Sequence, residues 1–199
     1  MPHGLNSSRL EAFSDGVIAV IITIMVLDLR VPAAHQLGNA AAIRGDLRLI
    51  LLYLLSFVQI GIYWVNHHYL IDDVEQVSHG ILWANLAFLF ALSLFPFATN
   101  WVGERGISSF SIALYAVVSV LPAITWVVLS NIICRHCGIP PAGSRTKQFV
   151  SASLYIAAIP VACYRPLAAI GMLVLVSILW LVPPGRLQEA AKADASSGT

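Results

Sequence analysis

The sequence predicts an all-α membrane protein with six transmembrane helices in each chain. Of its 199 residues, 58% are hydrophobic and only 11% are charged, whereas soluble domains average about 25% charged residues. The mean hydropathy is +0.81, and long apolar segments alternate with short polar ones. A transmembrane helix needs about 20 mostly apolar residues, so six of them leave room only for short loops and a tail. We therefore expect residues 1–183 to form one six-helix unit and residues 184–199 to be a disordered tail.

The first span is expected from about Ser8, a suitable helix cap, to about Arg30, with Pro32 just beyond its end. Its apolar run extends from Gly16 to Leu27 and contains a single hydroxyl, that of Thr23. A polar collar precedes this run and consists of Arg9, Glu11, Ser14 and Asp15. Because lipid cannot pair with a carboxylate, the collar predicts that this end of the helix packs against protein.

The other five spans follow from the remaining apolar segments and are expected at residues 47–70, 81–101, 108–133, 148–164 and 166–182. The sequence predicts a loop at 31–48, a short acidic loop at 72–79 and a turn at 103–106. Pro122 lies inside the fourth span, where neighbouring helices can tolerate a kink. Six spans place both termini on one side of the membrane. The 11 basic residues divide almost evenly between the two sides, so the positive-inside rule does not fix the orientation.

Charge and cysteine content argue against several kinds of site. A formal net charge of +1 without a clustered basic face argues against a nucleic-acid partner. The three cysteines, Cys134, Cys137 and Cys163, are too few for a disulfide framework. Cys134 and Cys137 have a metal-binding spacing, but with His136 they supply three ligands where a closed zinc site needs four. We expect an ordinary loop there, with no cofactor and no structural metal.

Three motifs together point to a family. The first is Arg9-x-x-x-Phe13-Ser14-Asp15 at the start of the first span. The second is YWVNHH at residues 63–68, and the third is HGILWAN at residues 79–85, followed by Pro96-Phe97. This combination resembles the R-x-x-x-F-S-D signature and the second- and third-helix patterns of the lysosomal and prokaryotic potassium channels of the transmembrane protein 175 type.

The resemblance implies a passive, potassium-preferring cation channel in the cell membrane with both termini in the cytoplasm. Animal members of that family carry two such units in one chain, whereas this sequence has one F-S-D tripeptide and no internal repeat. The resemblance therefore implies a homotetramer in which four copies of the first helix line a central pore. The hydrophobic constriction of the family corresponds by position to Val20, Ile24 and Leu27. Besides the bilayer and the other copies of the chain, the expected ligand is the permeating K⁺.

The helical period agrees with this assignment. At 100° per residue, Val20, Ile24 and Leu27 lie within about 60° of one another. Asp15 lies about 140° away from Val20 by the same arithmetic. If the apolar stripe faces the pore axis, Asp15 faces the protein interior and needs hydrogen-bond donors there. The second and third helices offer such groups in Trp64, His67 and Asn85.

We predict that Ser14 and Asp15 latch the first helix to the second and third, while Arg9 forms an ion pair or caps the helix. Thr23 either lends its hydroxyl to a dehydrating cation or bonds the carbonyl four residues earlier. Asp28 either concentrates cations by its charge or is a solvated helix end. The sequence contains no TVGYG filter, so selectivity would arise at rings of aliphatic side chains, which can gate by dewetting.

Two alternative functions stay open. A membrane-embedded metalloenzyme would draw its ligands from His67, His68, His79, Asp72 and Asp73. Adjacent histidines on a helix point about 100° apart, so two of these ligands cannot readily meet one ion. No catalytic spacing of serine, cysteine or carboxylate appears elsewhere, and we expect no enzyme. A secondary transporter usually has inverted repeats and helices broken at mid-membrane, whereas the first helix contains no glycine or proline after Gly16.

Overall fold

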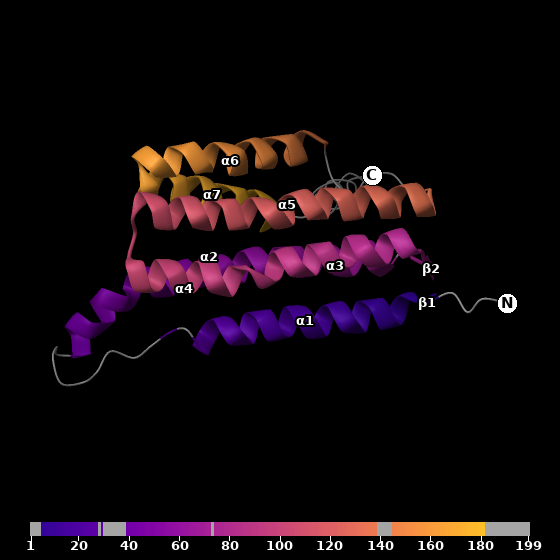
Figure 1. Cartoon of the computed structure of the whole chain (residues 1–199), viewed down its shortest axis with the longest axis horizontal. Helices are drawn as coiled ribbons and strands as arrows, with labels where there is room; N and C mark the ends of the chain where they lie inside the picture. The colour runs from indigo at the N-terminus through magenta and orange to yellow at the C-terminus, as the bar shows by residue number, and fades with distance from the viewer. Residues whose placement is uncertain (1–4, 28, 30–38, 73, 139–144, 182–199) are drawn as a thin grey trace, which may run out of the picture.

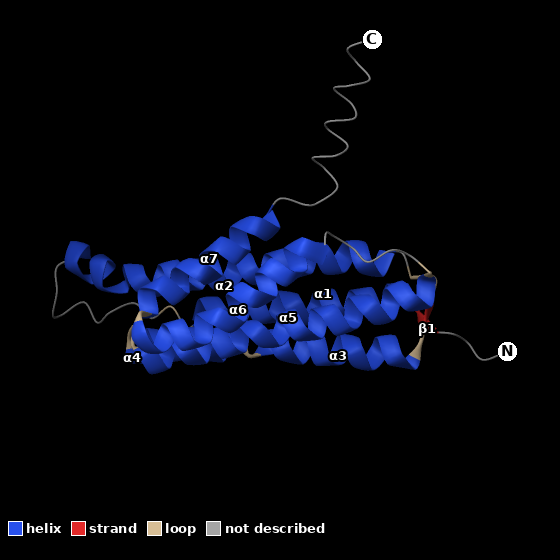
Figure 2. Ribbon diagram, turned by 90° about the horizontal axis from the view of Figure 1, so that it is seen from above, coloured by secondary structure: helices blue, strands red, loops and turns tan. Residues whose placement is uncertain are grey.

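The structure of the chain is a computed structural model that describes residues 5–27, 29, 39–72, 74–138 and 145–181. Nearly all of this part is helical (Figure 2), so the predicted all-α class is confirmed. The elements are β1 (Leu5–Asn6), α1 (Ser7–Leu27), α2 (Asn39–Asp72), β2 (Gln76–Val77), α3 (His79–Ser93), α4 (Phe95–Arg105), α5 (Ser109–Cys137), α6 (Arg145–Tyr164) and α7 (Pro166–Leu181). The predictions for Asp28, Arg30, Pro32, Asp73 and the tail at 184–199 concern residues outside the described part.

The helices form a single bundle in which α1 lies at one edge (Figure 1). α3 and α4 follow each other as one span, so the described helices make six passes. α5 packs between α3 and α4 on one side and α6 and α7 on the other, whereas α1 contacts α2, α3 and α4. Four passes have the length and apolar composition to cross a membrane, at 7–27, 49–72, 79–105 and 109–137. α7 is apolar but shorter, with 16 residues.

The structure departs from the predicted spans at several places. α2 begins at Asn39, inside the predicted loop at 31–48, because an alanine-rich segment favours helix. The third span divides at Leu94, since Pro96 lacks the amide proton that a continuous helix would require. α4 then runs through most of the predicted turn to Arg105, and the chain turns at Gly106, whose φ of +74° suits glycine.

The structure also contains a short strand pair that the sequence did not predict. β1 and β2 pair antiparallel, with Leu5 opposite Val77 and Asn6 opposite Gln76. Two-residue strands are too short to produce an alternating sequence pattern. The pair ties the start of α1 to the segment between α2 and α3.

Polar groups fix several helix ends. The hydroxyls of Ser78 and Ser108 accept hydrogen bonds from the backbone amides three residues later, at 3.3 Å and 3.2 Å, and so cap α3 and α5. α5 ends at Gly138 in the left-handed conformation, with φ +69°. Pro122 is buried, and α5 continues through it as one helix.

Candidate functional site

α1 has one face in the bundle and one face open. The side chains packed against the rest of the chain are those of Leu10, Ser14, Ile18, Ile21 and Met25. The opposite face carries the predicted constriction, and the exposed fractions are 53% for Val20, 46% for Ile24 and 77% for Leu27. The open face therefore presents branched aliphatic side chains that the rest of the described chain covers only in part.

Thr23 lies on the open face, and its hydroxyl proton is already engaged. Its Oγ1 donates to the carbonyl oxygens of Ala19 and Val20 in the same helix, at 3.0 Å each. This is one of the two alternatives for Thr23, the bond to the carbonyl four residues earlier. Since a hydroxyl oxygen also carries two acceptor lone pairs, Thr23 keeps an acceptor on the open face.

A buried chain of hydrogen bonds joins three helices on the opposite face of α1. Asn85 Nδ2 on α3 donates to Ser14 Oγ at 2.9 Å, and Ser14 Oγ donates to the Leu10 carbonyl at 2.8 Å. Asn85 Oδ1 lies 2.8 Å from Nε2 of His67 on α2. Because an amide oxygen only accepts, Nε2 carries the proton of His67. Ser14, His67 and Asn85 are each fully buried.

One stacking contact and one hydrogen bond hold the ring of His67. It stacks on Phe88 with a centroid distance of 5.8 Å and an interplanar angle of 7°. Its Nδ1 is buried and has no hydrogen-bond partner among the described residues. The bond to Asn85 is therefore the hydrogen bond that fixes the orientation of this imidazole.

Two further bonds connect α1 directly to α2. Trp64 Nε1 donates to Asp15 Oδ1 at 2.8 Å, and His68 Nδ1 lies 3.0 Å from Glu11 Oε1. Glu11 and Asp15 are one turn apart on α1, and Trp64 and His68 are one turn apart on α2. The earlier residue of α1 pairs with the later residue of α2, as expected for two antiparallel helices. Trp64 was predicted as a partner from the sequence, whereas the pairing of His68 with Glu11 was not. The matching four-residue spacing was the signal that could have revealed it.

The structure does not bring the rest of the R-x-x-x-F-S-D motif into this network. Arg9 is exposed near the start of α1, and no ion pair joins it to a described residue. Phe13 is 52% exposed and lies on the open side of the helix. Among the described residues, Ser14 and Asp15 are the two motif residues with hydrogen bonds to the neighbouring helices.

Metal-ligating side chains are not gathered into a site in the part of the chain that the structure describes. No group of three histidine, cysteine, aspartate or glutamate residues there could hold a metal ion. His67 and His68 contact different partners, and His79 is exposed at the start of α3. Cys134 is buried, whereas His136 next to Cys137 is exposed.

The fold and this network define an α-helical, multi-pass membrane protein in which an edge helix is latched on one face and open on the other. The family model described as "Endosomal/lysosomal potassium channel TMEM175" matches residues 9–96, from Arg9 of the motif to Pro96. A potassium channel of Chryseobacterium sp. (strain P1-3) is 40% identical over 195 residues, which are 96% of this chain and all of that protein. The chain belongs to the TMEM175 family of ion channels, and the resemblance drawn from the motifs is confirmed.

Other relatives match over different lengths. A potassium channel of Streptomyces collinus is 35% identical over 128 residues, 62% of each chain. The human endosomal/lysosomal proton channel TMEM175 is 32% identical over 102 residues, which are 45% of this chain and 20% of that protein. Among solved structures, the lysosomal potassium-selective channel TMEM175 homologue from Chamaesiphon minutus superposes with a TM-score of 0.70 at 26% identity, covering 88% of this chain and 96% of that chain. The family and these relatives are named as ion channels and not as enzymes.

Proposed function

We propose that this chain is a potassium-preferring cation channel that conducts passively through a central pore lined by α1. The observation that carries the proposal is the division of α1 into a latched polar face and an open face with Val20, Ile24 and Leu27. The relatives named as potassium channels support potassium as the permeant ion.

One copy of α1 cannot enclose a pore, so several chains must contribute. The sequence contains one R-x-x-x-F-S-D motif and therefore one such helix in each chain. We place four copies of α1 around the axis, in a homotetramer embedded in the cell membrane with both termini in the cytoplasm. All six passes of each chain then cross the bilayer. The open face of α1 would turn towards the axis. The hydrogen bonds of Ser14 and Asp15, on the opposite face, would keep the helix in that orientation.

The aliphatic rings supply the barrier to ions. With a rise of 1.5 Å per residue, the rings at Val20, Ile24 and Leu27 would extend over about 10 Å of the pore. Branched apolar side chains around a narrow pore exclude hydrated ions by dewetting until the ring widens. Since the Born cost of dehydration falls as ionic radius grows, such a barrier favours K⁺ over the smaller Na⁺. The lone pairs of Thr23, between the first two rings, would replace part of the water that the ion loses.

A flux assay on purified protein in liposomes tests the proposal. We would compare wild type with Val20→Ala, Ile24→Ala and Leu27→Ala, and use Val117→Ala as the matched control, since Val117 is an exposed apolar residue on α5. Passive K⁺ flux whose rate or K⁺/Na⁺ preference changes in the α1 variants and not in the control is the expected result.

Three other outcomes would contradict the proposal. No flux in any variant, from protein shown to be folded and tetrameric, would remove the channel. A saturable flux that depends on a counter-substrate would indicate the alternative, a secondary transporter. A stoichiometric transition metal in the purified protein would revive the metalloenzyme alternative with the α2 histidines.

A further inference from the structure

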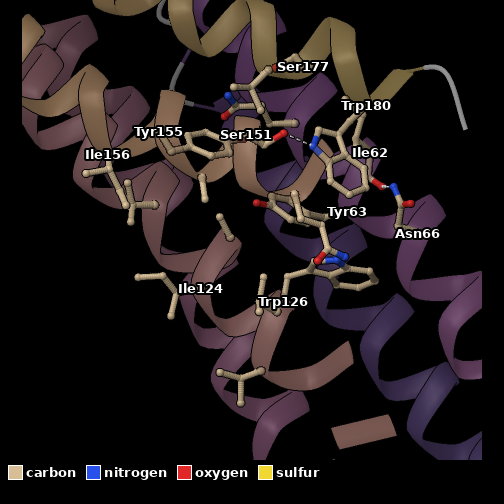
Figure 3. Close-up of a pocket in the computed structure, with 18 residues that line it drawn as sticks. Ile62, Tyr63, Asn66, Ile124, Trp126, Ser151, Tyr155, Ile156, Ser177 and Trp180 are labelled. Atoms are coloured by element: carbon tan, nitrogen blue, oxygen red, sulfur yellow. Dashed lines mark hydrogen bonds between the residues drawn. The ribbon is translucent and has the colours of Figure 1, made fainter. Parts of the chain in front are cut away.

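A cavity of about 260 Å³ lies between α2, α5, α6 and α7 (Figure 3). Its described lining residues come from these four helices, so the cavity is separate from the open face of α1. The lining is mostly aliphatic and aromatic, and the aromatic rings are those of Tyr63, Trp126, Tyr155 and Trp180. A volume just under the roughly 300–1,000 Å³ of small-molecule sites suits a small ligand.

Several polar groups in the lining already have partners. Trp180 Nε1 donates to Ser151 Oγ at 2.7 Å, the dashed contact in Figure 3. Ser177 Oγ donates to a carbonyl of its own helix at 3.0 Å, and Asn66 Nδ2 donates to the Ile62 carbonyl at 2.7 Å. These groups therefore have little need of a ligand.

Gln59 is the exception. This lining residue is 1% exposed, and its Nε2 is buried without a hydrogen-bond partner among the described residues. Its Oε1 receives only a long contact of 3.5 Å from the hydroxyl of Tyr115, which also lies 2.7 Å from Ser56 Oγ. Exchanging the amide oxygen and nitrogen would pair the nitrogen with Tyr115 and leave the oxygen unpaired instead, so one polar atom stays unsatisfied in either orientation.

We infer that this cavity binds a small, neutral, mostly apolar molecule whose single carbonyl group accepts a hydrogen bond from Gln59 Nε2. A water molecule would need two to four polar partners, and most of the groups here are already engaged. An ionised ligand would lose its hydration among apolar side chains without a charge to compensate it. The rings around the cavity favour a ligand with an aromatic body, which packs edge-to-face or offset against them.

The ligand would enter from the bilayer. Five lining residues on α5 and α6 are exposed on the outer surface, namely Ile124, Val127, Val128, Ala152 and Ile156. Because they are apolar, they form a mouth that a molecule dissolved in lipid reaches without crossing a polar barrier.

Photolabelling with benzophenone, a neutral aromatic ketone with one carbonyl acceptor, tests the inference. Wild-type protein in liposomes would be irradiated over a range of benzophenone concentrations, and mass spectrometry would locate the cross-links. We expect saturable labelling of the residues that line the cavity. The readout does not require ion conduction, so this inference and the proposed channel function can fail separately.

Three variants give the experiment its controls. Gln59→Leu keeps the side chain similar in size and removes the donor, so half-saturation should need roughly fivefold more benzophenone. Ala152→Trp blocks the exposed mouth and should lower cavity labelling about tenfold. Ala168→Trp adds the same side chain at an exposed position of α7 outside the lining and should label like wild type. Labelling that is unsaturable, that spreads over the lipid-facing surface, or that is as strong in Gln59→Leu as in wild type would overturn the inference.

Discussion

Asn85 is the residue whose loss should most weaken the attachment of α1. Its side chain bonds both Ser14 and His67, at 2.9 Å and 2.8 Å, and all three residues are fully buried. Asn85→Ala removes two interhelical hydrogen bonds, each worth about 0.6 and at most about 1.7 kcal/mol in membrane proteins. It also leaves His67 with both ring nitrogens unpaired, because Nδ1 already lacks a partner in the described structure. An unsatisfied buried group costs about 1–3 kcal/mol, so we expect a total loss of about 2–4 kcal/mol.

The free energy of unfolding in mixed micelles, followed by tryptophan fluorescence at fixed protein concentration, measures this loss. Asn131→Ala is the matched control, because Asn131 is exposed on α5, and its effect should stay within about 0.5 kcal/mol. A double-mutant cycle with His67→Phe, which keeps a ring to stack on Phe88, should give a coupling of about 0.6–1.7 kcal/mol. If Asn85→Ala is as mild as the control, or the coupling is zero, the buried chain does not hold α1.

Three further outcomes are expected. A side chain at Gly103 would place its Cβ 2.7 Å from Leu49 Cδ1, so Gly103→Val should lower the free energy of unfolding by roughly 1–3 kcal/mol, while Gly103→Ala needs only a small shift of the leucine. His68→Ala should change the same quantity by less than about 0.5 kcal/mol, because the pair with Glu11 is partly exposed, and a larger effect would show that the pair is shielded from water. Thr23→Val should leave stability within about 0.5 kcal/mol of wild type but lower K⁺ flux in liposomes, and an unchanged flux would remove Thr23 from the proposed pore.

The sequence predicts the class of the fold and several of the residues that hold α1 to α2 and α3, because a buried polar group needs a hydrogen-bond partner. A helix with Asp15 at the edge of its apolar run must find donors, and the second half of the next apolar segment, residues 63–69, is rich in them. The pairing among them was not predictable in the same way. Trp64 bonds Asp15, whereas Asn85 bonds Ser14 and His67, and this division depends on the rotation of each helix in the bundle.

Other features depend on packing that sequence alone does not specify. An apolar stripe such as that of Val20, Ile24 and Leu27 has the same composition whether it faces lipid, protein or a pore. That it is open in the folded chain becomes visible only when the partners of α1 are known. By contrast, Ser56 and Gln59 lie one turn apart in an apolar segment, and this polar spacing was a usable signal for a buried polar cluster.

The hydrogen bonds that attach α1 to the other helices lie near one end, so a tilt of this helix would have its hinge there. Its side-chain hydrogen bonds to described residues of α2 and α3 come from Glu11, Ser14 and Asp15, and the strand pair fixes its start. Beyond Asp15, Val20 lies about 7.5 Å and Leu27 about 18 Å along the helix axis. A 10° tilt about Asp15 would therefore move Val20 by about 1.3 Å and Leu27 by about 3 Å. In a pore lined by α1, the ring of Leu27, which is farthest from the hinge, would widen most. The ring of Val20, which is nearest to the hinge, would widen least.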